Sequence, residues 1–257
     1  SFTAAQDLVS TTAFTGMRII DGTGAEPVEN GVLLVRDGRV LATGTSAEIE
    51  IPADAELIDL AGKTIMPGLV NAHGHAPDTT AETLGVFARY GVTSVFSLGG
   101  EDASHISFRD AQDPASPRMA RLHVAGAVQE HQSAEAAVAG VAQMKALDVD
   151  IIKARVQMGS MPEAVYSELI AEAHRQNLQV AAHMYTLADA KGLVRNGVDV
   201  LAHSVRDAPV DTELLALMKQ NDTCYTPTLA RVVSTYIYES VPDFFSDPFF
   251  LREADLD

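Results

Sequence analysis

Short apolar runs alternate with longer amphipathic stretches from residue 64 onward, and this rhythm restricts the folds open to the chain. The runs cover residues 65–72, 92–98, 120–128, 149–156, 179–184, 198–203 and 224–229. Between them, residues 133–147 and 162–176 have helical patterns. The second pattern contains an apolar stripe at helical spacing, made of Val165, Leu169, Ile170 and Ala173. Strands that alternate with helices predict βα units, an α/β fold class and a parallel sheet.

Seven strands of this kind are predicted, whereas a complete (β/α)₈ barrel has eight and takes about 250 residues. Several runs end in residues that can bind metals, and such barrels carry their active sites at the carboxyl ends of their strands. We therefore predict a (β/α)₈ TIM-type barrel over residues 64–257 whose strand eight is not present in this chain. The rest of the fold was then lost or left out, or another chain supplies it. The exposed strand edges of an incomplete barrel would need covering, for example in a homo-oligomer.

A small β-sandwich-like domain is predicted over residues 1–63. Short apolar runs lie at residues 15–20, 31–36, 39–44 and 56–60. They predict an antiparallel unit, in which Asp37-Gly38 is the dipeptide preferred in a type I′ hairpin. Residues 21–24 (Asp-Gly-Thr-Gly) lack the third glycine and the following helix of a nucleotide-binding loop, so they are interpreted as a turn.

The composition excludes several classes of partner. No apolar run reaches the roughly 18 residues of a membrane span, so no membrane insertion is expected. A net charge of −17 argues against nucleic acid and against an anionic membrane surface. Cys224 is the only cysteine, which excludes an intrachain disulfide, and we predict a small buried core residue rather than a nucleophile. Because the chain starts at Ser1, its location stays open between the cytoplasm and, after removal of a signal peptide, the periplasm or the exterior.

Two histidines, His73 and His75, directly follow the first apolar run. On a strand, a spacing of two residues places both imidazoles on one face. Neutral imidazoles that converge at the end of a buried strand are typical of a metal site. Gly74 between them removes a side chain where the strand end must fit closely to its neighbours.

Three further candidate ligands lie on later apolar runs. His183 and His203 each end such a run, with one helix-length segment between them, and imidazole suits Zn²⁺ and similar divalent ions. Lys153 lies inside an apolar run, where a bare cation is costly. It either snorkels or pairs with a buried acid, or its neutral amine has taken up carbon dioxide to form a carbamate that bridges two metal ions. The remaining histidines, His105, His123, His131 and His174, lack such a placement.

Three residues are candidates for binding the substrate. Arg155 shares a strand face with Lys153, so it either pairs with a substrate carboxylate or forms a structural salt bridge. Tyr185 and Tyr225 lie at or near strand ends, where they either form hydrogen bonds with a substrate or pack in the core or at its rim.

The segment Pro67-Gly-Leu-Val-x-x-His-x-His75, followed in order by Lys153, His183 and His203, resembles the amidohydrolase superfamily. The resemblance is to its imidazolonepropionase-like branch, which includes prolidase-type metal-dependent dipeptidases, and it covers nearly the whole chain. It implies two divalent metal ions, with Zn²⁺ as the first expectation. In this family pattern His73 and His75 bind one ion, a carboxylated Lys153 bridges, and His183 and His203 bind the second.

The resemblance also implies a metal-dependent hydrolase in which a metal-bridged hydroxide attacks the amide carbonyl of a dipeptide, an N-acyl compound or another small molecule. Two alternatives stay open: a mononuclear hydrolase of a cyclic amide or ester with an unmodified Lys153, and a non-catalytic, truncated metal-binding protein. The family's strand-eight aspartate has no counterpart, because Asp243, Asp247, Asp255 and Asp257 lie in a loop-like tail. The chain alone is therefore expected to be inactive.

Overall fold

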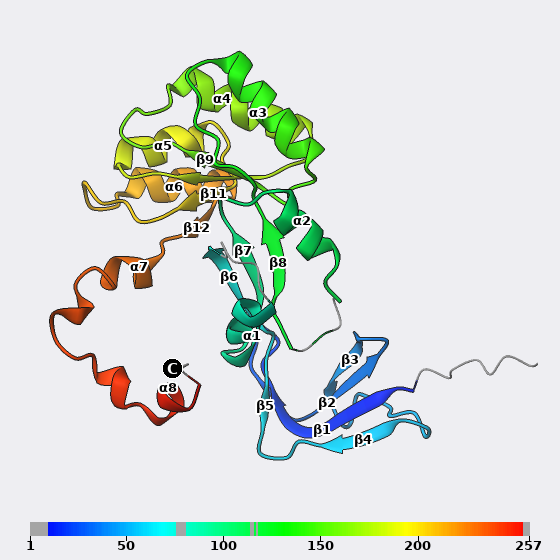
Figure 1. The fold of residues 1–257 in the computed structure, drawn as a ribbon. Coiled ribbons are helices and arrows are strands. Elements are labelled where there is room, and N and C mark those ends of the chain that lie inside the picture. The colour runs from blue at the N-terminus through cyan, green and yellow to red at the C-terminus, as the bar shows by residue number, and fades with distance from the viewer. Residues whose placement is uncertain (1–9, 76–80, 114–115, 117, 254–257) are drawn as a thin grey trace, which may run out of the picture. The chain divides into compact units, whose positions relative to one another are not determined.

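The computed structural model describes residues 10–75, 81–113, 116 and 118–253, and it contains two compact units, Ser1–Gly68 and Leu69–Asp257. The first unit holds a five-stranded sheet of β1 (Thr12–Ile19), β2 (Val28–Arg36), β3 (Arg39–Thr45), β4 (Glu56–Asp59) and β5 (Thr64–Ile65) (Figure 1). Its order is β3-β2-β1-β4, and β5 also pairs with β1. Ala13, Val32 and Leu34 form its buried core. The sandwich-like packing of two sheets stays a prediction.

The sheet of the first unit is mixed, which corrects the predicted antiparallel arrangement. β2 runs antiparallel to both β1 and β3, whereas β4 and β5 run parallel to β1. Residues 46–55 take the chain from β3 at one edge to the far side of β1, and this crossover gives β4 the direction of β1. In the predicted hairpin between β2 and β3, Asp37 and Gly38 both have positive φ, 52° and 68°, as a type I′ turn requires.

The strand predicted over residues 65–72 is two strands. Thr64–Ile65 is β5 and pairs with β1 in the first unit, whereas β6 begins at Leu69 in the second unit. Pro67 lies between them. Because proline has no backbone N–H, it cannot continue a hydrogen-bonded ladder, and the apolar run is interrupted there.

The described sheets of the second unit consist of seven strands, all in parallel pairs. They are β6 (Leu69–Gly74), β7 (Val92–Ser97), β8 (Arg121–Val124), β9 (Ile152–Arg155), β10 (Val180–His183), β11 (Val200–Ala202) and β12 (Cys224–Thr226). The orders are β6-β7-β8 in one sheet and β12-β11-β10-β9 in the other. A bridge between Gln129 and Ala154 connects the segment after β8 to β9. The α/β class with parallel sheets is confirmed, and closure into a barrel stays a prediction.

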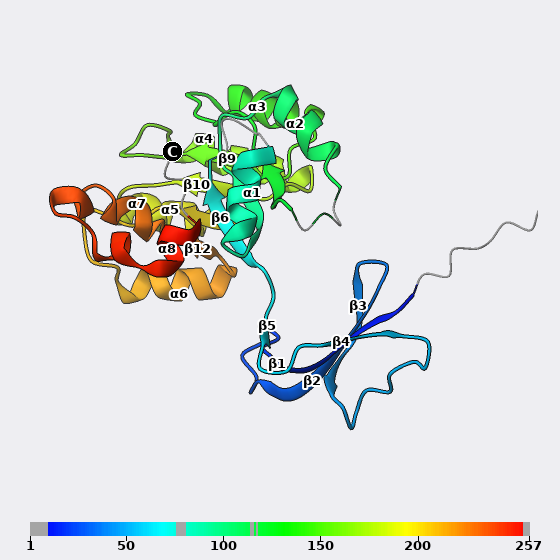
Figure 2. The ribbon, with the colours of Figure 1, turned by 60° about the horizontal axis from the view of Figure 1, so that its bottom comes forward.

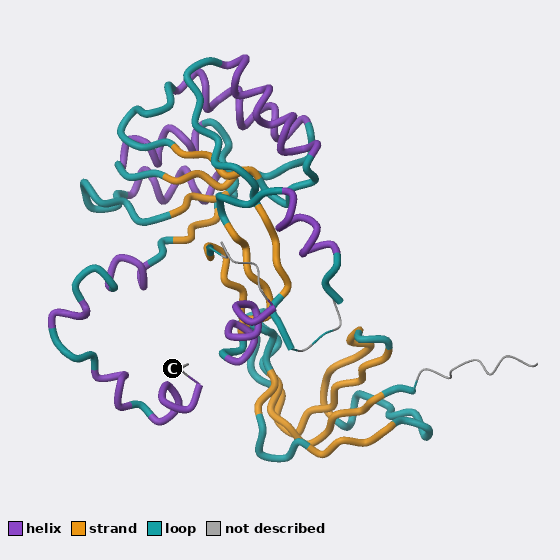
Figure 3. The backbone as a smooth tube through the Cα atoms, in the orientation of Figure 1, coloured by secondary structure: helices purple, strands orange, loops and turns teal. Residues whose placement is uncertain are grey.

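Helices follow these strands along the chain (Figure 3). They are α1 (Ala81–Arg89), α2 (Ala103–Asp110), α3 (Ala134–Ala146), α4 (Glu163–Arg175), α5 (Leu187–Arg195) and α6 (Thr212–Asn221). α3 and α4 occupy the two predicted helical stretches, and the stripe predicted on α4 is buried. Ser133 caps α3, because its hydroxyl accepts a hydrogen bond from the Ala136 N–H at 3.2 Å. In the described part of the chain, no helix combines the length and apolarity needed to cross a membrane.

The four-stranded sheet has a helix-covered face and an inner face. Helices α3 to α6 lie on one face of this sheet (Figure 2). Alternate residues of its strands, such as Ile152 and Val180, share one core with the apolar sides of these helices. Ala181 points to the opposite face, where it packs with residues that follow β7 and β8. Lys153 is in register with Ala181 on the neighbouring strand, and His183 is two residues further along. The candidate ligands of β9 and β10 therefore lie on the inner face.

Two predictions about the last part of the chain are corrected. Cys224 is exposed rather than buried, because it opens β12, whose hydrogen-bonded neighbour in the described sheet is β11 alone. An apolar run does not distinguish an edge strand from a central one. The segment predicted as a loop-like tail around Asp243 and Asp247 forms short helices, η2 (Asp243–Ser246) and α8 (Pro248–Glu253), while Asp255 and Asp257 lie outside the described residues. Two further short helices, α7 (Leu229–Val233) and η1 (Ile237–Glu239), precede them.

Candidate functional site

The second unit brings the five predicted metal ligands together at or near the carboxyl ends of β6, β10 and β11 and on the inner face of β9. The His203 ring centroid lies 4.4 Å from that of His73 and 4.3 Å from that of His183. His73 and His75 are neighbours, with 5.4 Å between their centroids. Lys153 Nζ lies 3.5 Å from His73 Nε2. We call these five side chains the histidine–lysine cluster.

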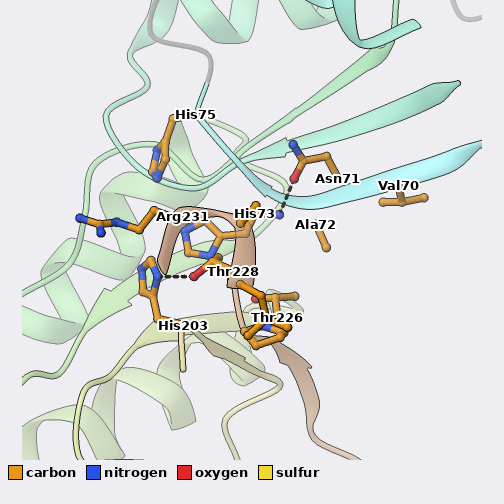
Figure 4. Close-up of a pocket in the computed structure, with 12 residues that line it drawn as sticks. Val70, Asn71, Ala72, His73, His75, His203, Thr226, Thr228 and Arg231 are labelled. Atoms are coloured by element: carbon orange, nitrogen blue, oxygen red, sulfur yellow. Dashed lines mark hydrogen bonds between the residues drawn. The ribbon is translucent and has the colours of Figure 1, made fainter. Parts of the chain in front are cut away.

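Two cavities border this cluster. The first, of about 430 Å³, is lined by all five members together with Leu98, Val128, Glu130 and Arg155. The second, of about 500 Å³, is lined by His73, His75 and His203, by residues of β6, and by the segment that follows β12 (Figure 4). A small molecule that enters either cavity would therefore meet imidazole side chains.

The end of β6 is shaped to present its histidines. The Asn71 side-chain oxygen accepts a hydrogen bond from the His73 N–H at 3.2 Å. Gly74 is buried against β7, and a Cβ built there would lie 2.8 Å from Val95 Cγ1. The structure thus confirms that the glycine between the two histidines is needed for a close fit.

We expect Gly74→Ala to lower the free energy of unfolding by about 1–3 kcal/mol, because the added methyl group overpacks the contact with Val95. Urea unfolding measures the effect. The control is the double variant Gly74→Ala, Val95→Ala, which removes the clashing methyl groups. Its loss of stability should be smaller than the sum of the losses in the two single variants, and strictly additive losses would contradict the predicted clash.

Burial keeps three imidazoles of the cluster, those of His73, His183 and His203, uncharged. Burial, with smaller contributions from nearby positive groups such as Lys153, lowers the pKa of His73 to about 3, that of His183 to about 4 and that of His203 to about 2. Burial also lowers the pKa of the Lys153 amine to about 8, while the charge of Glu101 acts in the opposite direction. At neutral pH these histidines therefore offer nitrogen lone pairs rather than positive charge.

Glu101 belongs to this environment and was not predicted from the sequence. It is 5% exposed, follows β7, and accepts hydrogen bonds from the Ser97 hydroxyl at 2.6 Å and from the backbone N–H groups of Gly99 and Ala125 at 3.1 and 3.3 Å. The signal in the sequence was an acidic residue just beyond a predicted strand end. Its charge acts on Lys153, as expected of a buried acid near that lysine.

The imidazole nitrogens of the cluster are chemically suited to bind a divalent metal ion. His73 Nδ1 and His183 Nε2 are buried without a hydrogen-bond partner among the described residues, which is uncommon for buried polar atoms. Neutral imidazole nitrogens are ligands for Zn²⁺ and related ions. However, within the described ranges no group of three or more His, Cys, Asp or Glu side chains could hold a metal ion as it stands. His73 Nε2 faces Lys153 instead.

Of the three predicted substrate-binding residues, Arg155 alone lines the first cavity, and neither tyrosine is among the described residues that line either cavity. The Arg155 guanidinium donates to Gln157 Oε1 at 3.2 Å and lies 3.9 Å from a Glu130 carboxylate oxygen. The Arg206 guanidinium carbon lies 5.2 Å from the Tyr185 ring centroid. The Tyr225 hydroxyl accepts a hydrogen bond from a backbone N–H in the loop after β11.

The other four histidines have contacts outside the cluster. His105 forms part of the capping box of α2, and the His123 ring stacks on Phe96 at 4.4 Å. His131 lies 2.9 Å from Gln129 Oε1, and the exposed His174 lies 2.9 Å from an Asp199 carboxylate oxygen. These four histidines are not among the predicted ligands, because they lack the placement of the cluster histidines at the ends of apolar runs.

Comparison with curated proteins gives short but significant matches. The chain is 45% identical over 53 residues to an imidazolonepropionase from Geobacillus sp. (strain WCH70), which is 19% of this chain and 12% of that protein. It is 51% identical over 53 residues to a 5-methylthioadenosine/S-adenosylhomocysteine deaminase from Nitratidesulfovibrio vulgaris, or 20% of this chain and 12% of that protein. No protein-family model matches the chain.

Solved structures match over most of the chain. A prolidase candidate from Bifidobacterium longum is 26% identical with a TM-score of 0.71, over 84% of this chain and 59% of that one. A Xaa-Pro dipeptidase with bound methionine has a TM-score of 0.76 over 95% of this chain and 73% of that one, and at 19% identity it shows the fold alone. Together these findings place the chain in the amidohydrolase superfamily, as the sequence predicted.

Proposed function

We propose that this chain belongs to a metal-dependent hydrolase that cleaves an amide bond in a peptide or N-acyl compound. The observation that carries the proposal is the meeting of four imidazoles and one lysine at the strand ends of the second unit, beside a cavity. The similarity to an imidazolonepropionase, a deaminase and a prolidase candidate supports a general amidohydrolase activity.

The members of the cluster have distinct proposed roles. His73 and His75 would hold one divalent ion, His183 and His203 would hold a second, and a carboxylated Lys153 would bridge the two, with Zn²⁺ as the first expectation. When bound, such ions supply Lewis acidity and lower the pKa of a water molecule. The chain's own contribution is to keep His73, His183 and His203 uncharged through burial, so that their lone pairs are available.

Lys153 has the environment that carboxylation requires. The reaction forms a bond between the amine nitrogen and the carbon of CO₂ and releases one proton, so the amine must be neutral. Burial lowers the pKa of Lys153 to about 8, which raises the neutral fraction at physiological pH. Arg155, at the rim of the same cavity, would bind a carboxylate of the substrate.

A second candidate is a mononuclear hydrolase of a cyclic amide or ester in which Lys153 stays unmodified. The contact between Lys153 Nζ and His73 Nε2 at 3.5 Å favours it, because an unmodified amine can donate a hydrogen bond to that nitrogen. Metal stoichiometry distinguishes the two candidates.

The test is elemental mass spectrometry on protein purified without chelator, with intact mass recorded on the same sample. Because this chain alone is expected to be inactive, hydrolysis is assayed with a longer protein that contains it, on dipeptides, N-acyl amino acids, a cyclic amide and an ester. We expect about two metal ions per chain and cleavage of the dipeptides or N-acyl compounds. One ion per chain, with cleavage of the cyclic amide or ester, would favour the second candidate. A folded protein that binds no added Zn²⁺, Mn²⁺ or Co²⁺ would contradict both.

A further inference from the structure

Two residues with unusual backbone conformations, His203 of the histidine–lysine cluster and Thr228 beside it, are joined by a hydrogen bond between their side chains. Eight described residues other than glycine have φ in the left-handed region, and five of them are Asn or Asp, which tolerate it. His203 (φ 75°) and Thr228 (φ 52°) also lie there, and Thr228 is β-branched, the class for which this conformation is least favourable. Their side chains touch: His203 Nδ1 lies 3.0 Å from Thr228 Oγ1 (Figure 4).

Backbone contacts hold the same two segments together. The His203 N–H donates to the Thr226 carbonyl at 2.9 Å, and the Ser204 hydroxyl donates to the Pro227 carbonyl at 2.8 Å. These hydrogen bonds hold the segment after β12 against the end of β11, beside the cluster. Strained conformations persist where surrounding structure over-determines them, and they concentrate at functional sites. The strain at Thr228 therefore calls for a functional explanation.

We propose that Thr228 is a positioning residue that fixes the ring orientation and the tautomer of His203. Its hydroxyl oxygen accepts a hydrogen bond from Nδ1–H, and the lone pair is then on Nε2. The His203 ring lies against the rings of His73 and His183, so the tautomer decides which nitrogen the cluster can use as a ligand. Hydrogen-bond partners of this kind orient histidines that bind metals and tune their affinity.

The first test does not require a metal. Long-range proton–nitrogen NMR of the metal-free protein, labelled with ¹⁵N-histidine, reports which nitrogen of His203 carries the proton. We expect Nδ1–H in the parent protein and in Thr228→Ser, which keeps the hydroxyl. In Thr228→Val, which keeps the branched shape and the strain but loses the hydroxyl, we expect a mixture of tautomers.

The second test measures Zn²⁺ affinity of the metal-stripped protein by calorimetry, and this step rests on the proposed function. We expect Thr228→Ser to bind within twofold of the parent, and Thr228→Val to bind about 10- to 100-fold more weakly. Thr228→Gly relieves the positive φ, so its thermal midpoint without metal should be at or above that of the parent. We expect its Zn²⁺ binding to weaken as much as that of the valine variant. If Thr228 had only a structural role, a glycine variant that is as stable as the parent would also bind Zn²⁺ as tightly as the parent.

Two results would overturn the proposal. One is a parent protein in which His203 carries its proton on Nε2. The other is a valine or glycine variant that keeps both the Nδ1–H tautomer and the parent's Zn²⁺ affinity. If the parent binds no Zn²⁺ but the tautomer follows the hydroxyl, the proposed function fails while the positioning role of Thr228 stands. The glycine variant keeps the test decisive if the valine variant does not fold.

Discussion

Lys153→Met is expected to abolish metal bridging and at the same time to stabilise the metal-free protein. If Lys153 bridges two ions as proposed, the bound metal should fall below the parent's content. Amide hydrolysis by a longer protein that contains this chain should fall by more than about 100-fold, the upper range for residues that only support a ligand. The stabilisation arises because Lys153 is 3% exposed and burial lowers the pKa of its amine from 10.5 to about 8. This difference corresponds to about 3 kcal/mol at pH 7.

The stabilisation by Lys153→Met depends on pH, because protonation of Lys153 and folding are linked. The unfolded chain binds the lysine proton more tightly than the folded chain, so the folded state is disfavoured below pH 8. The penalty fades as the pH rises from about 8 to 10.5. Methionine removes the titrating group, so the advantage of the variant should be largest near pH 7 and should shrink above pH 8. Urea unfolding at pH 7 and pH 10 measures it.

Lys145→Met is the matched control, because Lys145 is exposed on α3 and its replacement leaves the cluster intact. We expect parent-like metal content and only a small change in stability for this variant. A Lys153→Met protein that keeps the parent's metal content and activity would show that Lys153 is not a bridge. A Lys153→Met protein that is less stable than the parent at pH 7 would show that the amine is not penalised by burial.

The sequence predicted those parts of the site that depend on strand ends. His183 and His203 close apolar runs, and the carboxyl ends of parallel strands meet at one side of a sheet, so their convergence with His73 followed from pattern alone. The position of Lys153 on the inner face followed from the alternation of a strand. These predictions needed no knowledge of which strands are neighbours.

Other features depend on contacts that a pattern does not contain. Thr228 lies inside the last apolar run, where the pattern does not mark it as a site residue. Its contact with His203 arises only when the segment after β12 folds onto the end of β11. Glu101 is similar, because its hydrogen-bond donors come from the ends of β7 and β8. Cys224 was assigned to the core because an apolar run records hydrophobicity and not the place of a strand in its sheet.

Acidification is expected to unfold the metal-free protein well above the pH at which carboxylates titrate. Burial lowers the pKa of His73, His183 and His203 from 6.5 to between about 2 and about 4, so the folded chain resists their protonation. The unfolded chain takes up these protons near pH 6.5. Below that pH it therefore binds more protons than the folded chain, and the free energy of unfolding decreases as the pH falls.

Each of these histidines contributes a slope of up to about 1.4 kcal/mol per pH unit, or about 4 kcal/mol for the three together, once the pH is well below 6.5. A domain with a typical stability of about 5–15 kcal/mol would lose a large part of it by pH 5. Urea unfolding between pH 7.5 and pH 5 measures this slope. His203→Gln should reduce the slope by about one third. A urea midpoint that stays constant from pH 7 to pH 5 would mean that His73, His183 and His203 are not held neutral by burial.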